Sequence, residues 1–207
     1  MNSILLCIGA YLLGSIPTAV WVGKRFYNID VRNHGSGNAG ATNVFRVLGK
    51  KAGIPVLLID VIKGFLAVSL ARFSQYTFAS TQFINLELIL GVFSLVGHIF
   101  PVFASFKGGK GIATLLGIII AVYPYAAFIS ILIFLVIFLI SGYVSLGSMT
   151  AAVAFPIIVV YVLKIYAPSL VIFSVLIAIM VLLTHKKNIG RLLRNEEPKT
   201  KLINKKK

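Results

Sequence analysis

Long apolar runs alternate with short polar connections along the chain. A helix needs about 20 mostly apolar residues to cross a bilayer, and most of these runs approach that length. The region 112–140 is too long for one ordinary span, and Tyr123-Pro124 interrupts it where proline favours a turn. The predicted apolar helices cover residues 4–22, 54–71, 86–104, 112–122, 125–140, 149–163 and 169–184.

Lysines and arginines are unevenly distributed between these runs. All but three of the 20 lie in three segments: six within residues 24–51, two at 107–110 and nine after residue 184. Cytoplasmic connections carry an excess of basic residues, and all three segments reach the cytoplasm only if residues 112–140 form two spans. We therefore predict an all-α integral membrane protein with seven transmembrane helices, its N-terminus outside and its C-terminus cytoplasmic.

Counting the spans in this way places four polar segments on the cytoplasmic face. They are residues 32–46, 107–111, 142–148 and 185–191. Residues 1–195 are expected to form a single polytopic membrane domain. Residues 196–207 are expected to form a basic, solvated cytoplasmic tail that is disordered.

Composition supports the membrane class and narrows the chemistry. Hydrophobic residues make up 58% of the chain, the mean hydropathy is +0.97, and only five residues are acidic. The net charge of +15 follows from topology, so no nucleic-acid partner is expected. One cysteine, Cys7, excludes an internal disulfide, and with no Cys/His cluster and few acids we expect no metal and no cofactor.

Residues 32–43, the first glycine loop, place glycines and small polar residues between two apolar runs. Such a segment lets backbone N–H groups face one anion, and the flanking Arg32 and Arg46 are expected to strengthen the attraction. The spacing of its glycines matches a dinucleotide fingerprint, but no strand precedes it and no βαβ unit can form. The bland alternative is a flexible interhelical loop. The candidate phosphate contacts are Gly35, Ser36, Gly37, Asn38, Thr42, Asn43 and Arg46.

Residues 107–111, the second glycine loop, interleave three glycines with two lysines. The loop is not a Walker motif, because Ala104 and Gly111 stand where that motif requires glycine and Ser/Thr. The run that follows is predicted to be helical, so the loop should present backbone N–H groups and a positive helix end to an anion. The alternative is a basic anchor at the membrane surface. The candidate contacts are Lys107, Gly108, Gly109, Lys110 and Gly111.

Several polar residues lie within or next to the apolar runs. Asp60 and Lys63 are three residues apart and share a helix face, so they are expected to pair, either structurally or in catalysis. His98 is interpreted as a core histidine bonded to a neighbouring loop. His185 and Asn188, also three apart, follow the last span, where either an interfacial position or a functional role fits.

One acyl-transfer chemistry is excluded by spacing. Many thioester-using glycerolipid acyltransferases deprotonate the acceptor hydroxyl with a His-x4-Asp pair. No histidine of this chain has aspartate at that spacing: the positions are occupied by Ala39, Phe103 and Gly190.

Seven motifs, taken in order, resemble the bacterial integral-membrane acyl-phosphate:glycerol-3-phosphate acyltransferases, the PlsY family. The resemblance covers almost the whole chain, and its specificity comes from the combination of the motifs. They lie at residues 10–17, 32–49, 60–64, 97–101, 106–114, 143–145 and 185–192.

The resemblance implies transfer of a fatty acyl group from acyl phosphate to the 1-hydroxyl of sn-glycerol 3-phosphate, giving lysophosphatidic acid and phosphate. It also implies a multi-pass protein of the bacterial inner membrane with a cytoplasmic-side active site, working in the bilayer beside the enzyme that supplies acyl phosphate. The expected catalytic residues are Ser36, Arg46, Lys107, His185 and Asn188, and Ser145 is expected to contact substrate.

The residue types indicate which residues bind the donor and which bind the acceptor. Lys107, Lys110 and the loop N–H groups are expected to hold acyl phosphate and stabilise the departing phosphate. The first glycine loop and Arg46 are expected to bind the acceptor. His185 and Asn188 are expected to complete the acceptor site. Either a side chain or a substrate phosphate serves as the base.

Two other function classes share some of these sequence features. A phosphate-ester transporter would also need anion-binding loops, but it favours internal repeats and polar groups at mid-membrane. A non-catalytic scaffold protein has little need for four polar segments on one face. Turnover of acyl phosphate with glycerol 3-phosphate separates the three classes.

Overall fold

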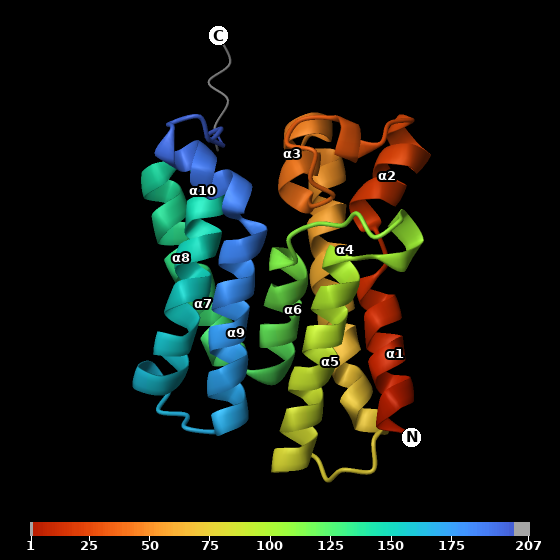
Figure 1. Ribbon diagram of the computed structural model, residues 1–207, viewed down its shortest axis with the longest axis vertical. Helices are drawn as coiled ribbons and strands as arrows, with labels where there is room; N and C mark the ends of the chain where they lie inside the picture. The colour runs from red at the N-terminus through yellow and green to blue at the C-terminus, as the bar shows by residue number, and fades with distance from the viewer. Residues whose placement is uncertain (1, 201–207) are drawn as a thin grey trace. The chain divides into compact units, whose positions relative to one another are not determined.

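The structure is a computed structural model that describes residues 2–200, and every regular element in that range is a helix (Figure 1). The chain divides into two compact units, Met1–Pro124 (unit 1) and Tyr125–Lys207 (unit 2). Within the described range, five helical segments are long and apolar enough to cross a membrane, and a bent helix pair makes a sixth. The helical, apolar architecture is that of an integral membrane protein.

Unit 1 contains six α-helices. Helix α4 packs against α6, and α1 packs against α5, through glycines that let the backbones approach closely. A Cβ atom at Gly64 or Gly117 would meet the backbone of the opposite helix at Thr114 or Val61. The helices are α1 (Ser3–Gly14), α2 (Thr18–Tyr27), α3 (Ala41–Leu48), α4 (Lys50–Ser69), α5 (Thr81–Ile99) and α6 (Ile112–Val122).

The first predicted apolar run is broken in two. Helix α1 ends at Gly14 and α2 begins at Thr18, because Pro17 lacks the N–H group that would continue the ladder. The break leaves the carbonyl of Ile16 outside the helical ladder, and the Lys63 ammonium donates to it at 2.8 Å. An interruption that looks local in sequence therefore supplies a partner for a buried charge on another helix.

Two apolar clusters stabilise unit 1. One joins α1, α4 and α5 through residues such as Leu6, Phe83 and Leu90. The other joins α2, α3 and α4 and includes Val31 and Val44, which flank the first glycine loop. Both ends of that loop are therefore anchored in a packed core. Helices α2 and α3 and the second glycine loop lie at the end of the unit away from the N-terminus (Figure 1).

Unit 2 contains α7 (Pro124–Ser141), α8 (Val144–Ile157), α9 (Pro168–Thr184) and α10 (Lys186–Leu193). The predicted interruption at Tyr123 is present, since α6 ends one residue before it and α7 begins one residue after. Helices α8 and α9 pack together. Helices α9 and α10 are bent by 60° at His185.

Two boundaries in unit 2 differ from the sequence-based expectation. The segment 142–148 was expected to be a polar connection, but α8 begins at Val144, so Ser145 lies in the first turn of a helix. A solvated tail was expected from residue 196; among the described residues 196–200 the others are exposed, whereas the Glu197 side chain is buried. The tail residues 201–207 lie outside the described range.

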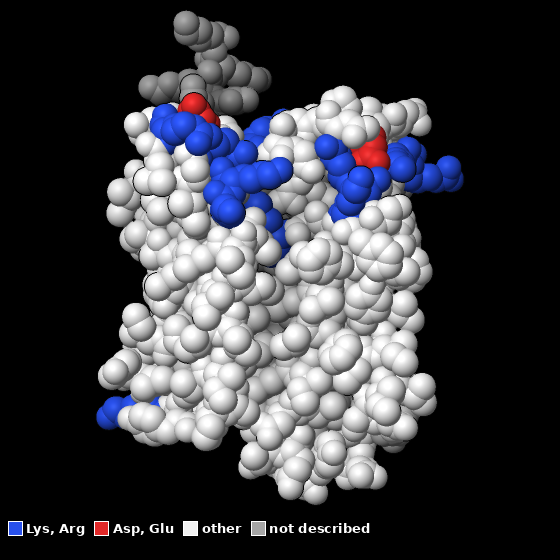
Figure 2. Space-filling view, viewed as in Figure 1, with Lys and Arg blue, Asp and Glu red and all other residues white. Residues whose placement is uncertain are grey.

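Basic side chains gather at one end of each unit (Figure 2). In unit 1 they come from the end of α2, from α3 and from the start of α4, and in unit 2 from α10. The unit 1 cluster includes Arg46 of the predicted phosphate site, and in unit 2 the basic residues of α10 flank the predicted Asn188.

Candidate functional site

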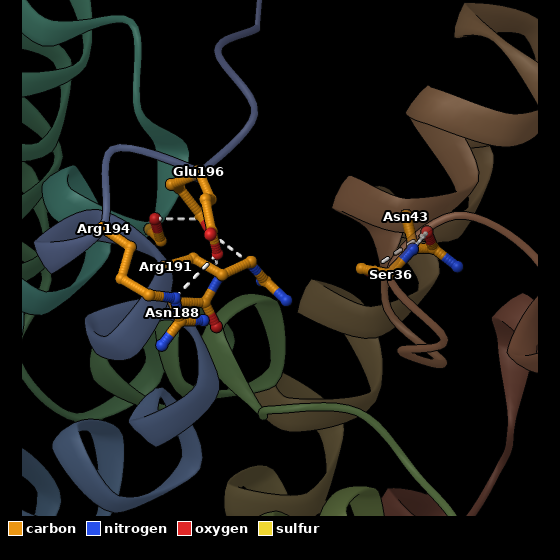
Figure 3. Close-up of polar contacts among 8 residues, drawn as sticks. Ser36, Asn43, Asn188, Arg191, Arg194 and Glu196 are labelled. Atoms are coloured by element: carbon orange, nitrogen blue, oxygen red, sulfur yellow. Dashed lines mark hydrogen bonds and ion pairs between the residues drawn. The ribbon is translucent and has the colours of Figure 1, made fainter.

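The first glycine loop is organised by a single buried amide. The Asn43 side-chain oxygen accepts from the Ser36 N–H at 2.8 Å and from the Ser36 hydroxyl at 3.1 Å (Figure 3). Its amide nitrogen donates to the carbonyls of Val31 and His34 at 2.8 and 3.0 Å. Gly35 adopts a φ of 60°, which lets the chain turn closely around this amide. Asn43 therefore fixes the loop and orients Ser36.

The exposed residues of this loop form a polar surface at the start of α3. Ser36 is exposed, and Thr42 and Arg46 are exposed one helical turn apart, so they share a face. Asn38 is half-buried. The Ser36 and Thr42 hydroxyls and the Arg46 guanidinium are groups that can bind a phosphate through charge-assisted hydrogen bonds.

Arg32, which sequence reasoning placed beside the anion, makes a different contact. Its guanidinium binds both carboxylate oxygens of Asp30, at 2.7 Å for the closest pair, and donates to the carbonyl of Ala104 at 2.9 Å. The hydrogen bond from Arg32 holds the pKa of Asp30 well below its usual range. Arg32 thus ties the first glycine loop to the segment before the second one, and does not present its charge to an anion.

The second glycine loop was expected to present its backbone N–H groups to an anion, and for three residues this is wrong. The N–H groups of Lys107, Gly108 and Gly109 donate to the carbonyls of Ala104, Ile99 and His98. The loop uses these groups because it crosses the end of α5, where the last helical carbonyls need donors.

Close packing explains two glycines of this loop. A Cβ atom on Gly108 would meet the carbonyl oxygen of His98, and one on Gly109 would meet the His98 ring and the Ala39 carbonyl. Ala39 belongs to the first glycine loop, so the two loops touch at Gly109. Of the two lysines in this loop, Lys107 is exposed and Lys110 is half-buried, and α6 begins directly after Gly111.

A buried polar cluster lies beneath both loops. The Asp60 carboxylate accepts from the Thr18 hydroxyl at 3.0 Å and pairs with Lys63 at 2.9 Å, which confirms the predicted pair. His98 Nδ1 lies 2.9 Å from the Thr114 hydroxyl, and all five side chains are buried. The adjoining cavity has a volume of about 10 Å³, room for roughly one water. This cluster therefore supports the loops and is too closely packed to hold a substrate.

In unit 2, His185 and Asn188 lie at and just after the bend between α9 and α10, and both are buried. His185 Nδ1 lies 2.8 Å from the carbonyl of Val181, which can only accept, so the neutral ring carries its proton on Nδ1. Asn188 and Ser145 both donate to the Glu197 carboxylate, at 2.6 and 2.7 Å.

Sequence reasoning missed Glu197 and gave Arg191 no role. The Arg191 Nε donates to Glu197 at 2.7 Å. The signal that points to Glu197 is its rarity, since it is one of only five acids and lies within a strongly basic terminus. Within residues 2–200, no group of three or more His, Cys, Asp or Glu side chains is placed to hold a metal ion.

Comparison with known proteins supplies the family. The sequence model of the glycerol-3-phosphate acyltransferase family matches residues 4–195. A glycerol-3-phosphate acyltransferase of Listeria monocytogenes is 44% identical, covering 97% of this chain and 98% of the relative. One from Chlorobium limicola is 42% identical, covering 91% and 92%.

Two solved structures have the same fold. Both are crystal structures of PlsY, an integral membrane glycerol 3-phosphate acyltransferase. The glycerol 3-phosphate form gives a TM-score of 0.86 at 40% identity and covers 96% of each chain. The lysophosphatidic acid form gives 0.83 at 39% identity, covering 96% of this chain and 95% of that one. Motif order, fold and sequence identity agree, and the chain belongs to the glycerol-3-phosphate acyltransferase family of integral membrane proteins.

Proposed function

We propose that this acyltransferase takes its acyl group from acyl phosphate and transfers it to the 1-hydroxyl of sn-glycerol 3-phosphate. The observation that carries the proposal is the pair of glycine loops in unit 1, with an exposed Lys107 in the second loop and an exposed Arg46 on α3 just after the first. Arg32 and the close approach of Gly109 to Ala39 hold these loops against each other. Two neighbouring cationic loops suit a reaction in which both substrates carry phosphate.

Within unit 1 the two loops have different roles. Lys107 and Lys110 hold the phosphate of the donor and stabilise it as it departs. Ser36, Asn38, Thr42 and Arg46 grip the acceptor. Asn43 is a positioning residue, because its hydrogen bonds go to the loop itself. Gly35, Gly37, Gly108, Gly109 and Gly111 shape the two loops.

Within unit 2, the residues assigned to the reaction are Ser145, His185 and Asn188. The acceptor hydroxyl oxygen attacks the acyl carbonyl carbon, and the bond from that carbon to the phosphate oxygen breaks. The carboxylates next to the two loops, Asp30 and Asp60, are both ion-paired, so we assign the hydroxyl proton to the departing phosphate. The products are 1-acyl-glycerol 3-phosphate and inorganic phosphate, without a cofactor.

The donor is tested with purified protein and labelled glycerol 3-phosphate. We expect acyl phosphate to serve as the donor, because the second glycine loop is assigned to its phosphate. Lysophosphatidic acid and inorganic phosphate should form in equal amounts. Acyl-CoA and acyl carrier protein thioesters are expected to give less than about one per cent of that rate, the loss that one missing electrostatic contact produces. Comparable turnover with acyl-CoA at matched concentrations would refute the donor assignment.

We further propose seven spans, with the short apolar helix α6 as the fourth, the N-terminus outside and the C-terminus in the cytoplasm of a bacterial inner membrane. The distribution of lysine and arginine supports this topology. The substrate loops would then face the cytoplasm, where an enzyme that makes acyl phosphate can deliver it.

The topology is tested by cysteine labelling in a Cys7→Ser background. Single cysteines at Ser36, Ser141 and Asn195 are expected to react with a membrane-impermeant maleimide only after the cells are opened. A cysteine at Tyr166, exposed in the connection between α8 and α9, should react in intact spheroplasts. Labelling of Ser36→Cys from outside would contradict the orientation.

A further inference from the structure

Two successive residues just before the second glycine loop adopt a strained backbone conformation. Ser105 and Phe106 have φ angles of 54° and 58°, in the left-handed region, where the Cβ atom of an L-residue lies too close to the following carbonyl oxygen. Neither is glycine, and both side chains are exposed, so their packing does not hold the turn. Such a conformation persists only where the surrounding structure fixes it, and Lys107 follows directly.

The carbonyl of Ala104 receives two of the bonds that fix this turn. It accepts from the Lys107 N–H at 3.2 Å, which closes the turn around Ser105 and Phe106. It also accepts from the Arg32 guanidinium at 2.9 Å, across a separation of 72 residues in the chain. Arg32 therefore contacts the same oxygen that the Lys107 backbone uses, and it links the strained turn to the first glycine loop.

Arg32 is itself fixed by Asp30. Its Nε and one terminal nitrogen donate to the Asp30 carboxylate, at 2.7 Å for the closest pair, while the other terminal nitrogen donates to Ala104. The Arg32 and Asp30 side chains are only 22% and 16% exposed. A guanidinium holds its donors in one rigid plane, an arrangement that lysine does not have. Asp30 therefore sets the direction from which Arg32 approaches the Ala104 carbonyl.

We propose that Arg32 is a positioning residue for Lys107, because it holds, through Ala104, the strained turn that places the Lys107 ammonium at the donor phosphate. The inference rests on the proposed function, in which Lys107 binds that phosphate. Arg32 begins the first glycine loop, which is assigned to the acceptor, yet its loss should weaken binding of the donor. A displacement of about 1 Å caused by a distant substitution can cost roughly 100-fold.

The proposal is tested by titration calorimetry of the purified full-length protein with two probes, glycerol 3-phosphate and a short-chain acyl phosphonate, which mimics the donor but cannot transfer its acyl group. Arg32→Gln should weaken binding of the acyl phosphonate roughly 10- to 100-fold and leave the Kd of glycerol 3-phosphate unchanged. Arg32→Lys should show a smaller loss, because lysine keeps the charge opposite Asp30 without the planar set of donors.

Two variants at the partners of Asp30 and Arg32 provide a substitute and a control. Asp30→Asn should reproduce the loss of phosphonate binding, because it releases the guanidinium, and it replaces Arg32→Gln if that variant fails to fold. Lys24→Ala is the matched control. Lys24 pairs with the same carboxylate at 3.5 Å, but its side chain is 58% exposed, and it should leave both Kd values unchanged.

A double-mutant cycle separates positioning from general damage to the fold. Lys107→Ala should also weaken phosphonate binding, and adding Arg32→Gln to it should cause no further loss, because Arg32 acts through Lys107. Losses that add, or an equal loss for glycerol 3-phosphate, would overturn the proposal. An unchanged Kd for Arg32→Gln beside a weakened Lys107→Ala would also overturn it, but would leave the donor assignment standing. If Lys107→Ala binds the phosphonate normally, the donor assignment is refuted and the positioning role with it.

Discussion

Replacing Arg46 by lysine is expected to reduce acyl transfer roughly 30- to 1,000-fold, which corresponds to a loss of about 2–4 kcal/mol of transition-state stabilisation. Arg46 is exposed one turn after Thr42 on α3, and its planar guanidinium can bind a phosphate through two parallel hydrogen bonds. Lysine keeps the charge but offers a single point contact. Steady-state kinetics with glycerol 3-phosphate varied should show the loss mainly in kcat/KM for the acceptor.

Lys107→Ala is the companion change and should act on the other substrate. Its loss, of similar size, is expected when acyl phosphate is varied, because Lys107 is assigned to the donor phosphate. Lys51→Ala is the control, since Lys51 is an exposed basic residue at the start of α4, outside both loops, and should keep near-normal rates. If Arg46→Lys and Lys107→Ala both fold and behave like the control, the two loops are anchors at the membrane surface and the site assignment is wrong.

Replacing Asp60 by asparagine is expected to destabilise the protein by about 3–5 kcal/mol, the cost of leaving a buried charge without its counterion. Lys63 is buried 2.9 Å from Asp60, and it also donates to the carbonyl of Ile16, which is neutral. The variant should unfold at a markedly lower temperature or denaturant concentration in detergent than the parent protein does.

Two comparisons isolate the charge as the cause. Thr18→Val removes one hydrogen bond to the Asp60 carboxylate but keeps both charges, and it should cost about 1.5–3 kcal/mol. The double change Asp60→Leu with Lys63→Met removes both charges and should recover much of the stability, because well-packed apolar residues can replace a buried ion pair. Equal effects of Asp60→Asn and Thr18→Val would show that the ion pair contributes little.

The helical architecture could be read from the sequence because apolar runs of membrane-spanning length leave the backbone few alternatives. In a bilayer every backbone polar group must be bonded within its own segment, so the run lengths alone indicate helices. The interruption at Tyr123 and the Asp60–Lys63 pair follow from local rules, since proline ends a helix and residues three apart share a face. The seven motifs were enough to indicate the family.

The tertiary structure decided which polar groups are used internally. Asn43 and Asn38 are the same residue type in the same loop, yet Asn43 is buried and bonded to the loop while Asn38 is half-buried. Arg32 and Arg46 flank the same glycines, yet Arg32 is committed to Asp30 and Ala104. Each outcome depends on contacts between residues that are distant in sequence or on opposite sides of a turn.

Glu197 shows most clearly what could not be predicted from the sequence. By composition it belongs to a basic, polar terminus that should be solvated, and the sequence by itself determined no more than that. Its burial depends on the chain reversal after α10 and on donors from Ser145, 52 residues earlier in the chain, and from α10. Hydrogen bonds across such separations are determined by how the helices pack and by the direction that the chain takes after a turn. The periodicity of a single segment carries no information about that geometry, so only the folded structure could decide it.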